Sequence, residues 1–350
     1  MYRNTYVKVN LKNLEYNIKK IIEFKNNYKY YFGVVKADSY GHYGIKPVER
    51  IIESGINYLA VSSLEEALEI RKEIKNIPIL CLGIIDLCYL EECLKNNITV
   101  TISNLEYAKN LSDNYKELKV HIKINTGMNR LGFSNSKELE EAYSILKEKV
   151  IIEGIYTHIY NDSSKDDTLN QISLFEEITK NIDISTIPIV HFGGSNFILN
   201  YDKLEYVNGC RLGIVMYGLT DNKLDLKSTF SLHSKVIQIN EVENSTVGYN
   251  GNYKVNGKER IAVVQIGYAD GIIRKNSGRY VFINNKKYDI VGNICMDMLF
   301  VRVDNDVCVN NEVLIIKDND HIKYISDYLD TIPYEIICSI SKRVPRVYEE

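Results

Sequence analysis

The sequence lacks the features that mark several large classes of protein. Its 43 Lys and Arg residues nearly balance 46 Asp and Glu residues, and the formal net charge of -3 gives no field that would attract nucleic acid or a membrane surface. No apolar run approaches the ~20 residues that span a bilayer. Residues 1–10 contain no apolar core of a secretory signal. We therefore expect a cytoplasmic enzyme or binding protein with no nucleic-acid or membrane partner.

Cysteine is used without any recognisable pattern. The seven cysteines are an odd number, they are widely scattered, and no Cys-x-x-Cys pair occurs. This distribution argues against a disulfide framework and against a structural zinc site. It favours a reducing compartment, and we expect no metal.

The first two thirds of the chain show a regular alternation of strand-like and helix-like segments. A chain of 350 residues suits one large domain and a smaller one. Amphipathic stretches such as 64–70 and 137–143 predict helices, the first with Ser63 as N-cap and Glu66 completing a capping box. The expected strands are 30–37, 58–62, 77–83, 98–103, 119–125, 150–159, 187–192 and 207–217. Eight alternations favour a (β/α)8 barrel, because a doubly wound sheet usually has fewer strands.

The pattern changes after about residue 224. Closely spaced strand-like runs follow at 232–241, 260–268, 279–283, 286–291, 298–303 and 312–316, separated by turn signals, and only 322–329 looks helical. We therefore expect an α/β protein in which residues 1–224 form the barrel. Residues 225–350 are expected to form a smaller, mainly-β domain packed tightly against it, since no low-complexity linker separates the two.

The segment from Tyr30 to His42 carries the clearest chemical candidate. Its apolar and aromatic run predicts a strand buried on both faces, and Lys36 stands where that strand should end. A lysine at such a rim is either a solvated residue or a reactive amine. Desolvation would lower its pKa from the usual ~10.4 and make it a Schiff-base nucleophile.

Other polar residues also stand at expected strand ends, where barrel enzymes keep their working residues. They are Arg130, His158, Ser195 after Gly193-Gly194, and Arg211. Each has an ordinary structural explanation: a hydrogen-bonded histidine, arginines in ion pairs, or a simple turn. Together with Lys36 they make a rim suited to an anionic cofactor, because exposed glycine N–H groups beside a hydroxyl suit a phosphate.

Segments from end to end of the chain resemble those of alanine racemases. They include Val35-Lys36-Ala37-Asp38-Ser39-Tyr40-Gly41-His42, which is similar to the family's pyridoxal-phosphate lysine segment, Gly127-Met128-Asn129-Arg130-Leu131-Gly132-Phe133, and residues 154–158, 211–214, 216–218, 266–271, 295–297 and 343–346. They occur in the family's order and at similar intervals. The resemblance implies a barrel followed by a β domain, which the pattern of strands and helices predicts independently.

The resemblance also implies a cofactor and two catalytic bases. Lys36 matches the lysine that holds pyridoxal phosphate and later acts as one base, and Tyr249 matches the tyrosine that works on the opposite face of the substrate. Racemisation removes the Cα proton from one face and returns it to the other, so two bases need not swing. In the family the tyrosine comes from the partner subunit. A homodimer with shared active sites is therefore implied, interconverting L- and D-alanine for peptidoglycan.

Further site residues follow from the matching segments, as implications of the resemblance. The family's phosphate contacts are matched by Tyr40, Ser195, Gly213 and Ile214, and its arginine that faces the pyridine nitrogen by Arg211. His158 matches the residue that contacts the catalytic tyrosine, and the substrate carboxylate is expected to bind Arg130 and Met296. Lys123 matches a lysine that is carbamylated in some members, and the supporting residues are Tyr268 and Asp297. Because a guanidinium does not share a proton with a cationic pyridinium, the ring nitrogen facing it should stay unprotonated.

Several positions depart from the family pattern and leave alternatives open. Leu212, Gly194 and Asn250 replace a common proline, asparagine and glycine, and Lys342 stands where many members have a tyrosine near the phosphate. Residues 195–201 also look somewhat like serine racemases of the vancomycin-resistance type. A non-catalytic pyridoxal-phosphate homeostasis protein is a second alternative, although that class lacks the β domain and its tyrosine. A related decarboxylase is a third, although its second-domain motifs are not found.

Overall fold

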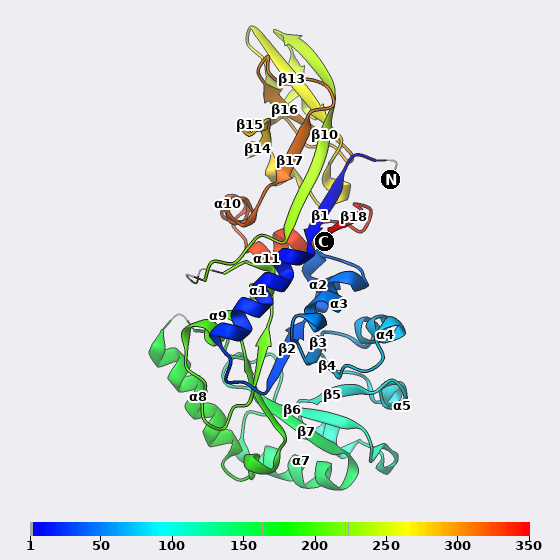
Figure 1. The fold of residues 1–350 in the computed structure, drawn as a ribbon, viewed down its shortest axis with the longest axis vertical. Helices are drawn as coiled ribbons and strands as arrows, with labels where there is room; N and C mark the ends of the chain where they lie inside the picture. Colours follow the sequence, from blue (N-terminus) through cyan, green and yellow to red (C-terminus); the bar gives the residue numbers. More distant parts are fainter. Residues whose placement is uncertain (1–2, 163, 221, 223) are drawn as a thin grey trace.

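Eight parallel strands close into a barrel in the first part of the computed structural model, which describes residues 3–162, 164–220, 222 and 224–350 (Figure 1). The strands are β2 (Tyr30–Val34), β3 (Tyr58–Val61), β4 (Ile79–Cys81), β5 (Ile98–Ile102), β6 (Lys119–Lys123), β7 (Ile151–Tyr156), β8 (Ile189–Gly193) and β9 (Gly209–Leu212). Each pairs with the next in sequence, and β2 pairs with β9 to close the ring. The predicted (β/α)8 barrel is confirmed.

Helices cover the outside of this barrel. They are α1 (Leu11–Phe24), α3 (Ile45–Glu53), α4 (Leu64–Glu73), α5 (Leu90–Lys95), α6 (Leu105–Lys109), α7 (Ser136–Lys149), α8 (Lys165–Thr179) and α9 (Ser195–Asn200). Side chains that precede a helix start several of them: Ser63 accepts from the Glu66 N–H, and Asn135 accepts from the Glu138 N–H. The two predicted helical stretches therefore correspond to α4 and α7.

A second, mainly-β part lies above the barrel in Figure 1 and confirms the expected architecture. Its strands are β1 (Tyr6–Asn10), β10 (Phe230–Glu243), β13 (Lys258–Val264), β14 (Tyr280–Ile283), β15 (Lys286–Val291), β16 (Leu299–Val303), β17 (Glu312–Ile316) and β18 (Arg346–Glu349), with a small hairpin of β11 (Thr246–Val247) and β12 (Tyr253–Lys254). The order is β13-β16-β15-β14-β17-β10-β1-β18, and β13 also pairs with β10.

The two ends of the chain meet in this second sheet. Strand β1 pairs antiparallel with β10 and parallel with β18, so residues 6–10 belong to a sheet built otherwise from the last third of the chain. The expected division between residues 224 and 225 stays a prediction. Because the chain starts in one part, fills the other and returns, the two parts are held together by more than one connection.

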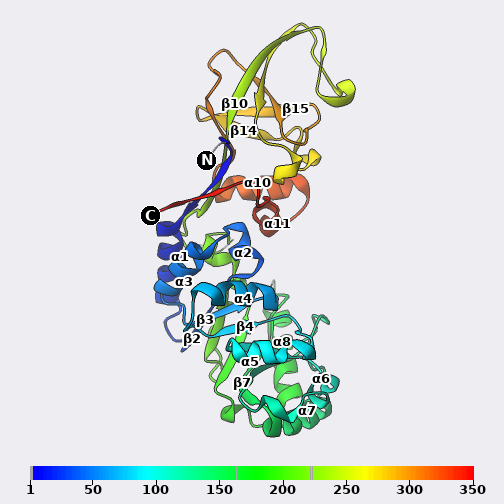
Figure 2. The ribbon, with the colours of Figure 1, turned by 90° about the vertical axis from the view of Figure 1, so that its right-hand side faces the viewer.

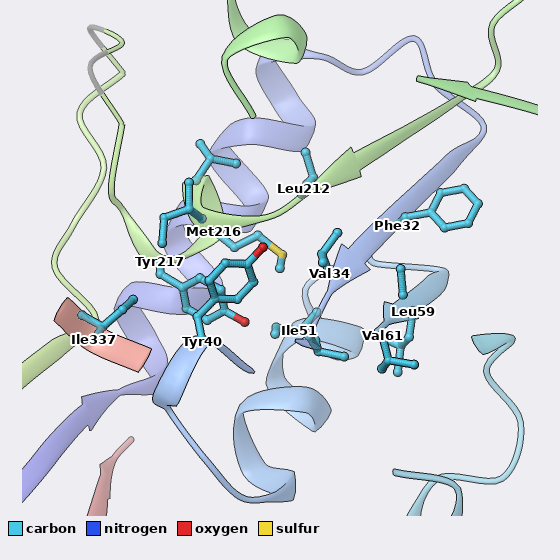
Figure 3. Packing of buried hydrophobic residues seen from close by; sticks show 14 of the residues in the cluster. Phe32, Val34, Tyr40, Ile51, Leu59, Val61, Leu212, Met216, Tyr217 and Ile337 are labelled. Atoms are coloured by element: carbon cyan, nitrogen blue, oxygen red, sulfur yellow. The ribbon is translucent and has the colours of Figure 1, made fainter. Parts of the chain in front are cut away.

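Two helices lie between β17 and β18, where the sequence predicted only one. Helix α10 (Asn319–Leu329) matches the predicted 322–329, and α11 (Pro333–Cys338) was missed because six residues are too few to show a helical period. Figure 2 shows α11 at the junction with the barrel. There Ile337 lies beside Tyr40 and Tyr217 in the apolar core, as Figure 3 shows.

The described residues contain neither a membrane-spanning helix nor a metal-binding cluster. No helix among them is long and apolar enough to cross a bilayer. Within the same ranges, no group of three His, Cys, Asp or Glu side chains is placed to hold a metal ion. All seven cysteines are free thiols.

Candidate functional site

A pocket of about 490 Å³ opens at the carboxyl ends of the barrel strands. Most of the residues expected from the sequence line it: Lys36, Tyr40, Lys123, Arg130, His158, Ser195, Arg211, Gly213 and Ile214. They come from the ends of five different strands or from the turns that follow, and closure of the barrel brings them together.

The chain segment that follows Lys36 has an unusual backbone. Strand β2 ends at Val34, earlier than the predicted residue 37, and α2 (Lys36–Gly41) follows. Four successive residues in α2, Ala37 to Tyr40, have φ between 52° and 54°, the left-handed region. Each L-residue there costs about 1–2 kcal/mol, so the surrounding structure must hold the turn in place. Strain of this kind concentrates at functional sites.

Groups from three parts of the chain hold this left-handed turn. The Glu66 carboxylate accepts hydrogen bonds from the N–H groups of Ala37 and Ser62 at 2.7 Å each, so Glu66 stabilises the turn. The sequence had instead predicted that Glu66 would complete the capping box. The His42 Nδ1 lies 2.9 Å from the Ser39 carbonyl oxygen. Gly41 has φ +78°, and a Cβ there would lie 2.3 Å from the Ile337 carbonyl oxygen.

Two lysines of the pocket are desolvated. Burial lowers the pKa of Lys36, and the positive charge of Arg130 lowers it further. Burial together with the charges of Arg211 and Arg130 brings the pKa of Lys123 well below its usual value. The Lys123 amine donates to the Ile124 carbonyl at 2.9 Å. A lowered pKa increases the unprotonated fraction of an amine, which is the form that attacks a carbonyl carbon.

Arg211 lies buried at the floor of the pocket. Its Nη1 donates to His191 Nδ1 at 2.8 Å, and its Nη2 donates to the Thr157 carbonyl at 2.8 Å and lies 3.4 Å from His158 Nδ1. Burial lowers the pKa of Arg211 to about 10, so the guanidinium remains charged at neutral pH. Burial and then the charge of Arg211 bring the pKa of His158 to about 3, so its imidazole is neutral.

Two hydroxyl groups and the backbone at Gly213 lie close together on one side of the pocket. A Cβ at Gly213 would lie 2.9 Å from the Tyr40 hydroxyl and 3.6 Å from the Ser195 hydroxyl. Gly194 has φ +128°, a conformation open to glycine, and it leads directly into α9 at Ser195. Hydroxyls beside exposed backbone N–H groups match the donor set that a phosphate requires.

The pocket carries an excess of positive charge. Lys36, Arg130 and Arg211 line it, and Asp162 is the one carboxylate among the described lining residues. In addition to burial, the charge of Arg130 lowers the pKa of Lys36, and the charge of Arg211 lowers the pKa of His158. An anion bound here would remove that repulsion, so the site is suited to an anionic ligand.

Four expected site residues lie outside this pocket, on the second part of the molecule. Tyr249 is 68% exposed, and Tyr268 and Met296 are exposed as well. The Asn293 side chain donates to the Tyr249 carbonyl at 2.7 Å, and the Ala269 N–H next to Tyr268 donates to the Met296 carbonyl at 3.0 Å. None of the four residues is among those that line the pocket of their own chain.

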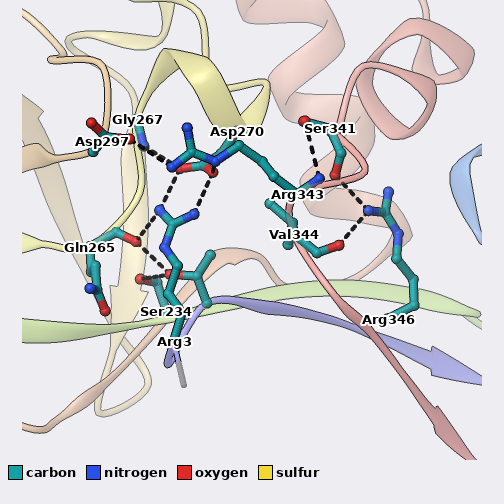
Figure 4. Close-up of polar contacts among 11 residues, drawn as sticks. Arg3, Ser234, Gln265, Gly267, Asp270, Asp297, Ser341, Arg343, Val344 and Arg346 are labelled. Carbon is teal, nitrogen blue, oxygen red and sulfur yellow. Dashed lines mark hydrogen bonds and ion pairs between the residues drawn. The ribbon is translucent and has the colours of Figure 1, made fainter. Parts of the chain in front are cut away.

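Asp297 belongs to a charge network centred on the buried Asp270 (Figure 4). Asp297 pairs with Arg343 at 2.7 Å, and Arg343 also reaches the fully buried Asp270 at 3.1 Å. Arg3 donates hydrogen bonds to both carboxylate oxygens of Asp270 at 2.6 Å each, and Asp270 accepts a hydrogen bond from the Gly267 N–H at 3.0 Å. The network fixes the loops that carry Tyr268 and Met296 relative to both chain ends.

The departures from the family pattern have local explanations. Asn250 adopts φ 62°, which asparagine tolerates better than most residues, so it can stand where glycine is common. Lys342 turns its amine to Asp38 at 3.2 Å and is absent from the pocket lining. Tyr334 from α11 lines the pocket instead, with its ring 5.9 Å from that of Tyr40. Leu212 is fully buried at the end of β9.

Sequence reasoning missed several residues that shape the site. Tyr156 and Tyr334 line the pocket, and Glu66 braces the left-handed turn. Tyr156 lies inside the predicted strand 150–159, and only the structure shows that β7 ends there. Tyr334 lies in the helix that the pattern did not predict, and Glu66 had been assigned to a cap, so neither gave a signal.

Comparison with known proteins covers the chain from end to end. The family model described as "Alanine racemase, N-terminal domain" matches residues 9–221, and "Alanine racemase, C-terminal domain" matches residues 229–348. A curated relative from Clostridium kluyveri, named alanine racemase, is 35% identical over 99% of this chain and 94% of its own length. The alanine racemase structure from Clostridium difficile 630 superposes with a TM-score of 0.94 at 33% identity, covering 100% of this chain and 97% of that one.

The barrel, the β domain and the lysine site define an amino-acid racemase, an enzyme of the isomerase class. The chain belongs to the alanine racemase family. Members of that family depend on pyridoxal phosphate. The histidine racemase from Leuconostoc mesenteroides has the same fold, with a TM-score of 0.89 at 23% identity over 100% of this chain and 99% of that one.

Proposed function

We propose that the protein interconverts L- and D-alanine with pyridoxal phosphate held on Lys36. The observation that carries the proposal is the desolvated Lys36 amine at the start of a strained turn, facing a cation-rich pocket. A structural lysine would need neither the strain nor the desolvation, because both cost free energy. D-Alanine is a building block of peptidoglycan, and we propose that its supply, in the cytoplasm, is the biological role.

The pocket residues fit pyridoxal phosphate. The Tyr40 and Ser195 hydroxyls with the backbone at Gly213 and Ile214 would hold the phosphate, whose charge would compensate the surplus of cations. Arg211 would face the ring nitrogen. Because a charged guanidinium only donates, the facing nitrogen would accept and stay unprotonated.

When bound, the cofactor supplies the electron sink that stabilises negative charge at the substrate Cα. The chain's own residues would orient the substrate and move the proton. Arg130 would bind the substrate carboxylate, together with the backbone N–H of Met296 of the partner subunit. Lys36 would take or return the Cα proton on one face, and Tyr249 of the partner subunit would do so on the other. His158, neutral in the pocket, would contact this tyrosine.

The position of Tyr249 supports a homodimer with shared sites. Tyr249, Tyr268 and Met296 are exposed on the second part, and none of them lines the pocket of its own chain. A large exposed aromatic side chain held by a fixed backbone is typical of a contact surface. We propose that this surface closes the partner's pocket and that each site is incomplete without the second subunit.

The substrate assignment is tested by measuring racemisation rates on a panel of L-amino acids that includes alanine, serine and histidine. We expect alanine to have the highest kcat/KM. A higher value for serine would favour the vancomycin-resistance type of enzyme and overturn the alanine assignment. Cofactor absorbance without interconversion of any amino acid would support the non-catalytic alternative.

A further inference from the structure

A chain of hydrogen bonds runs from Arg211 through the interior of the barrel. Arg211 Nη1 lies 2.8 Å from His191 Nδ1, and His191 Nε2 lies 2.8 Å from His121 Nδ1. His121 Nε2 lies 3.3 Å from an oxygen of the Glu153 carboxylate. The four residues come from four consecutive strands, β9, β8, β6 and β7, and they connect the pocket floor to the opposite end of the barrel.

Only one arrangement of protons satisfies this chain. A guanidinium can only donate, so His191 Nδ1 accepts and carries no proton. A neutral imidazole then has its proton on Nε2, and His191 donates to His121 Nδ1. By the same reasoning His121 carries its proton on Nε2 and donates to Glu153. Both histidines are therefore neutral Nε2–H tautomers, and the chain has a positive end at Arg211 and a negative end at Glu153.

Ionisation behaviour agrees with this arrangement. Burial lowers the pKa of both His121 and His191, which keeps them neutral. Burial alone would raise the pKa of Glu153, but hydrogen bonds from His121, Tyr58 and Lys119 outweigh it and bring the value to about 2. The Tyr58 hydroxyl donates to Glu153 at 2.6 Å and the Lys119 amine lies 3.1 Å away, so the carboxylate is held from several sides.

The barrel is built around these side chains. A Cβ at Gly154 would lie 2.6 Å from the His121 ring, one at Gly209 would lie 2.8 Å from the His191 Cβ, and one at Gly193 would lie 2.2 Å from Arg211 Nη2. Each of these strand glycines leaves space for one member of the chain. The His191 ring is also stacked between Phe32 at 4.4 Å and Tyr156 at 4.7 Å. The imidazoles can therefore not turn to other partners.

We infer that Glu153, His121 and His191 form a positioning relay that points the Arg211 guanidinium at the cofactor ring. The relay fixes the tautomer of His191, so that a lone pair and never an N–H group faces Arg211. The relay residues themselves touch neither cofactor nor substrate. This inference rests on the proposed function for the role of Arg211, while the tautomer chain stands on the hydrogen bonds alone.

The relay is tested in the full-length protein through the imidazole ¹⁵N resonances. The sequence has only six histidines, and His191 is assigned by substitution. In Glu153→Leu the proton on His121 Nε2 loses its acceptor. His121 is then free to carry the proton on Nδ1. The His191 proton would then lose its acceptor on that side, so it is no longer held on Nε2. Glu153→Gln keeps a carbonyl acceptor for His121, and Tyr58→Phe removes a neighbour of Glu153 outside the chain. His121→Phe breaks the relay in its middle if Glu153→Leu does not fold.

A second measurement reads the orientation of Arg211. Pyridoxal phosphate and its 1-deaza analogue, which lacks the ring nitrogen, are titrated into each variant. In the wild type we expect pyridoxal phosphate to bind about ten- to a hundredfold more tightly, the range for a hydrogen bond to a charged group. Glu153→Leu and His121→Phe should lose most of this preference, and Glu153→Gln and Tyr58→Phe should keep it.

The outcomes separate the relay from the proposed function. An Nε2–H tautomer of His191 in the wild type that is lost in Glu153→Leu or His121→Phe, and kept in both controls, supports the relay. A wild-type His191 with its proton on Nδ1, or a tautomer and cofactor preference that both breaking variants leave unchanged, overturns it. A wild type that binds neither pyridoxal compound overturns the proposed function, and the tautomer measurement still decides the relay.

Discussion

A single methyl group added at Gly193 should disturb the site without removing any functional group. In Gly193→Ala the new Cβ would lie 2.2 Å from Nη2 and 2.3 Å from Cζ of Arg211. That is more than about 1 Å closer than ordinary van der Waals contact. The backbone of β8 is fixed by pairing with β9, where Gly193 stands opposite Arg211, so the guanidinium has to move.

The size of the effect follows from the bonds that the movement breaks. Arg211 donates to His191 and to the Thr157 carbonyl at 2.8 Å each, and a shift of about 1 Å exceeds the range of both bonds. Hydrogen bonds to a charged group contribute about 1.5–3 kcal/mol each. We expect the variant to lose about 2–4 kcal/mol of folding free energy after partial relaxation. Its affinity for pyridoxal phosphate should fall about ten- to a hundredfold.

The assay is a titration of cofactor-free protein with pyridoxal phosphate, paired with urea unfolding. Gly33→Ala is the matched control, because its Cβ would lie 2.9 Å from the Ile51 side chain, among apolar groups away from the pocket. The control should lose about 1–3 kcal/mol of folding free energy and keep its cofactor affinity. If Gly193→Ala binds the cofactor as well as the control does, Arg211 is not the constrained contact that we describe.

Four further predictions concern the two proposed bases, the shared sites, Lys123 and acid stability. Tyr249→Ala should slow solvent deuterium exchange into L-alanine more than into D-alanine, by about 10²–10⁴-fold. When Lys36→Ala and Tyr249→Ala subunits are mixed, about half of the dimers contain one of each, and each of these has one intact site of two. The mixture should therefore recover roughly a quarter of the wild-type activity. Lys123 has the low pKa that favours reaction with carbon dioxide, so the intact mass should include one added carbon dioxide. Burial lowers the pKa of His42 to about 4, below its value in the unfolded chain, so the unfolded state binds more protons as the pH falls. The free energy of unfolding should therefore fall by about 2 kcal/mol from pH 7 to pH 5. This fall should be smaller in His42→Gln.

Each of these predictions has an outcome that contradicts it. Equal loss of deuterium exchange from both enantiomers would refute the two-base assignment, and mixed subunits without any recovered activity would refute the shared sites. A mass that matches the unmodified chain would show that the Lys123 amine is free. A drop in stability between pH 7 and pH 5 that is the same in wild type and His42→Gln would place the titration on other groups.

The sequence predicted the barrel well because its strands are short runs of apolar residues between amphipathic helices. All eight expected strands exist, although β2 ends three residues early and the run to residue 217 includes a 3-10 turn at Ile214–Tyr217. The pairing of β1 with β18 joins residues about 340 positions apart, and no local pattern signals such a pairing. The short helix α11 was not predicted because six residues are too few to show a helical period.

The chemistry of the site was only partly visible in the sequence. The lysine, arginines and glycine-serine turn were found because they end predicted strands. The left-handed turn was not, since four successive L-residues with positive φ contradict every local preference and exist only because Glu66, His42 and α11 hold them. The relay was missed because His121, Glu153 and His191 meet only when the barrel closes.

The central claim is that the Lys36 amine forms an imine with the aldehyde of pyridoxal phosphate. It is tested most directly by incubating the purified protein with the cofactor, reducing with borohydride and mapping the labelled peptide by mass spectrometry. We predict a yellow protein before reduction and a stable pyridoxyl label on Lys36 afterwards. A protein that takes up no chromophore, or a label that falls on other lysines while Lys36 stays unmodified, would contradict it.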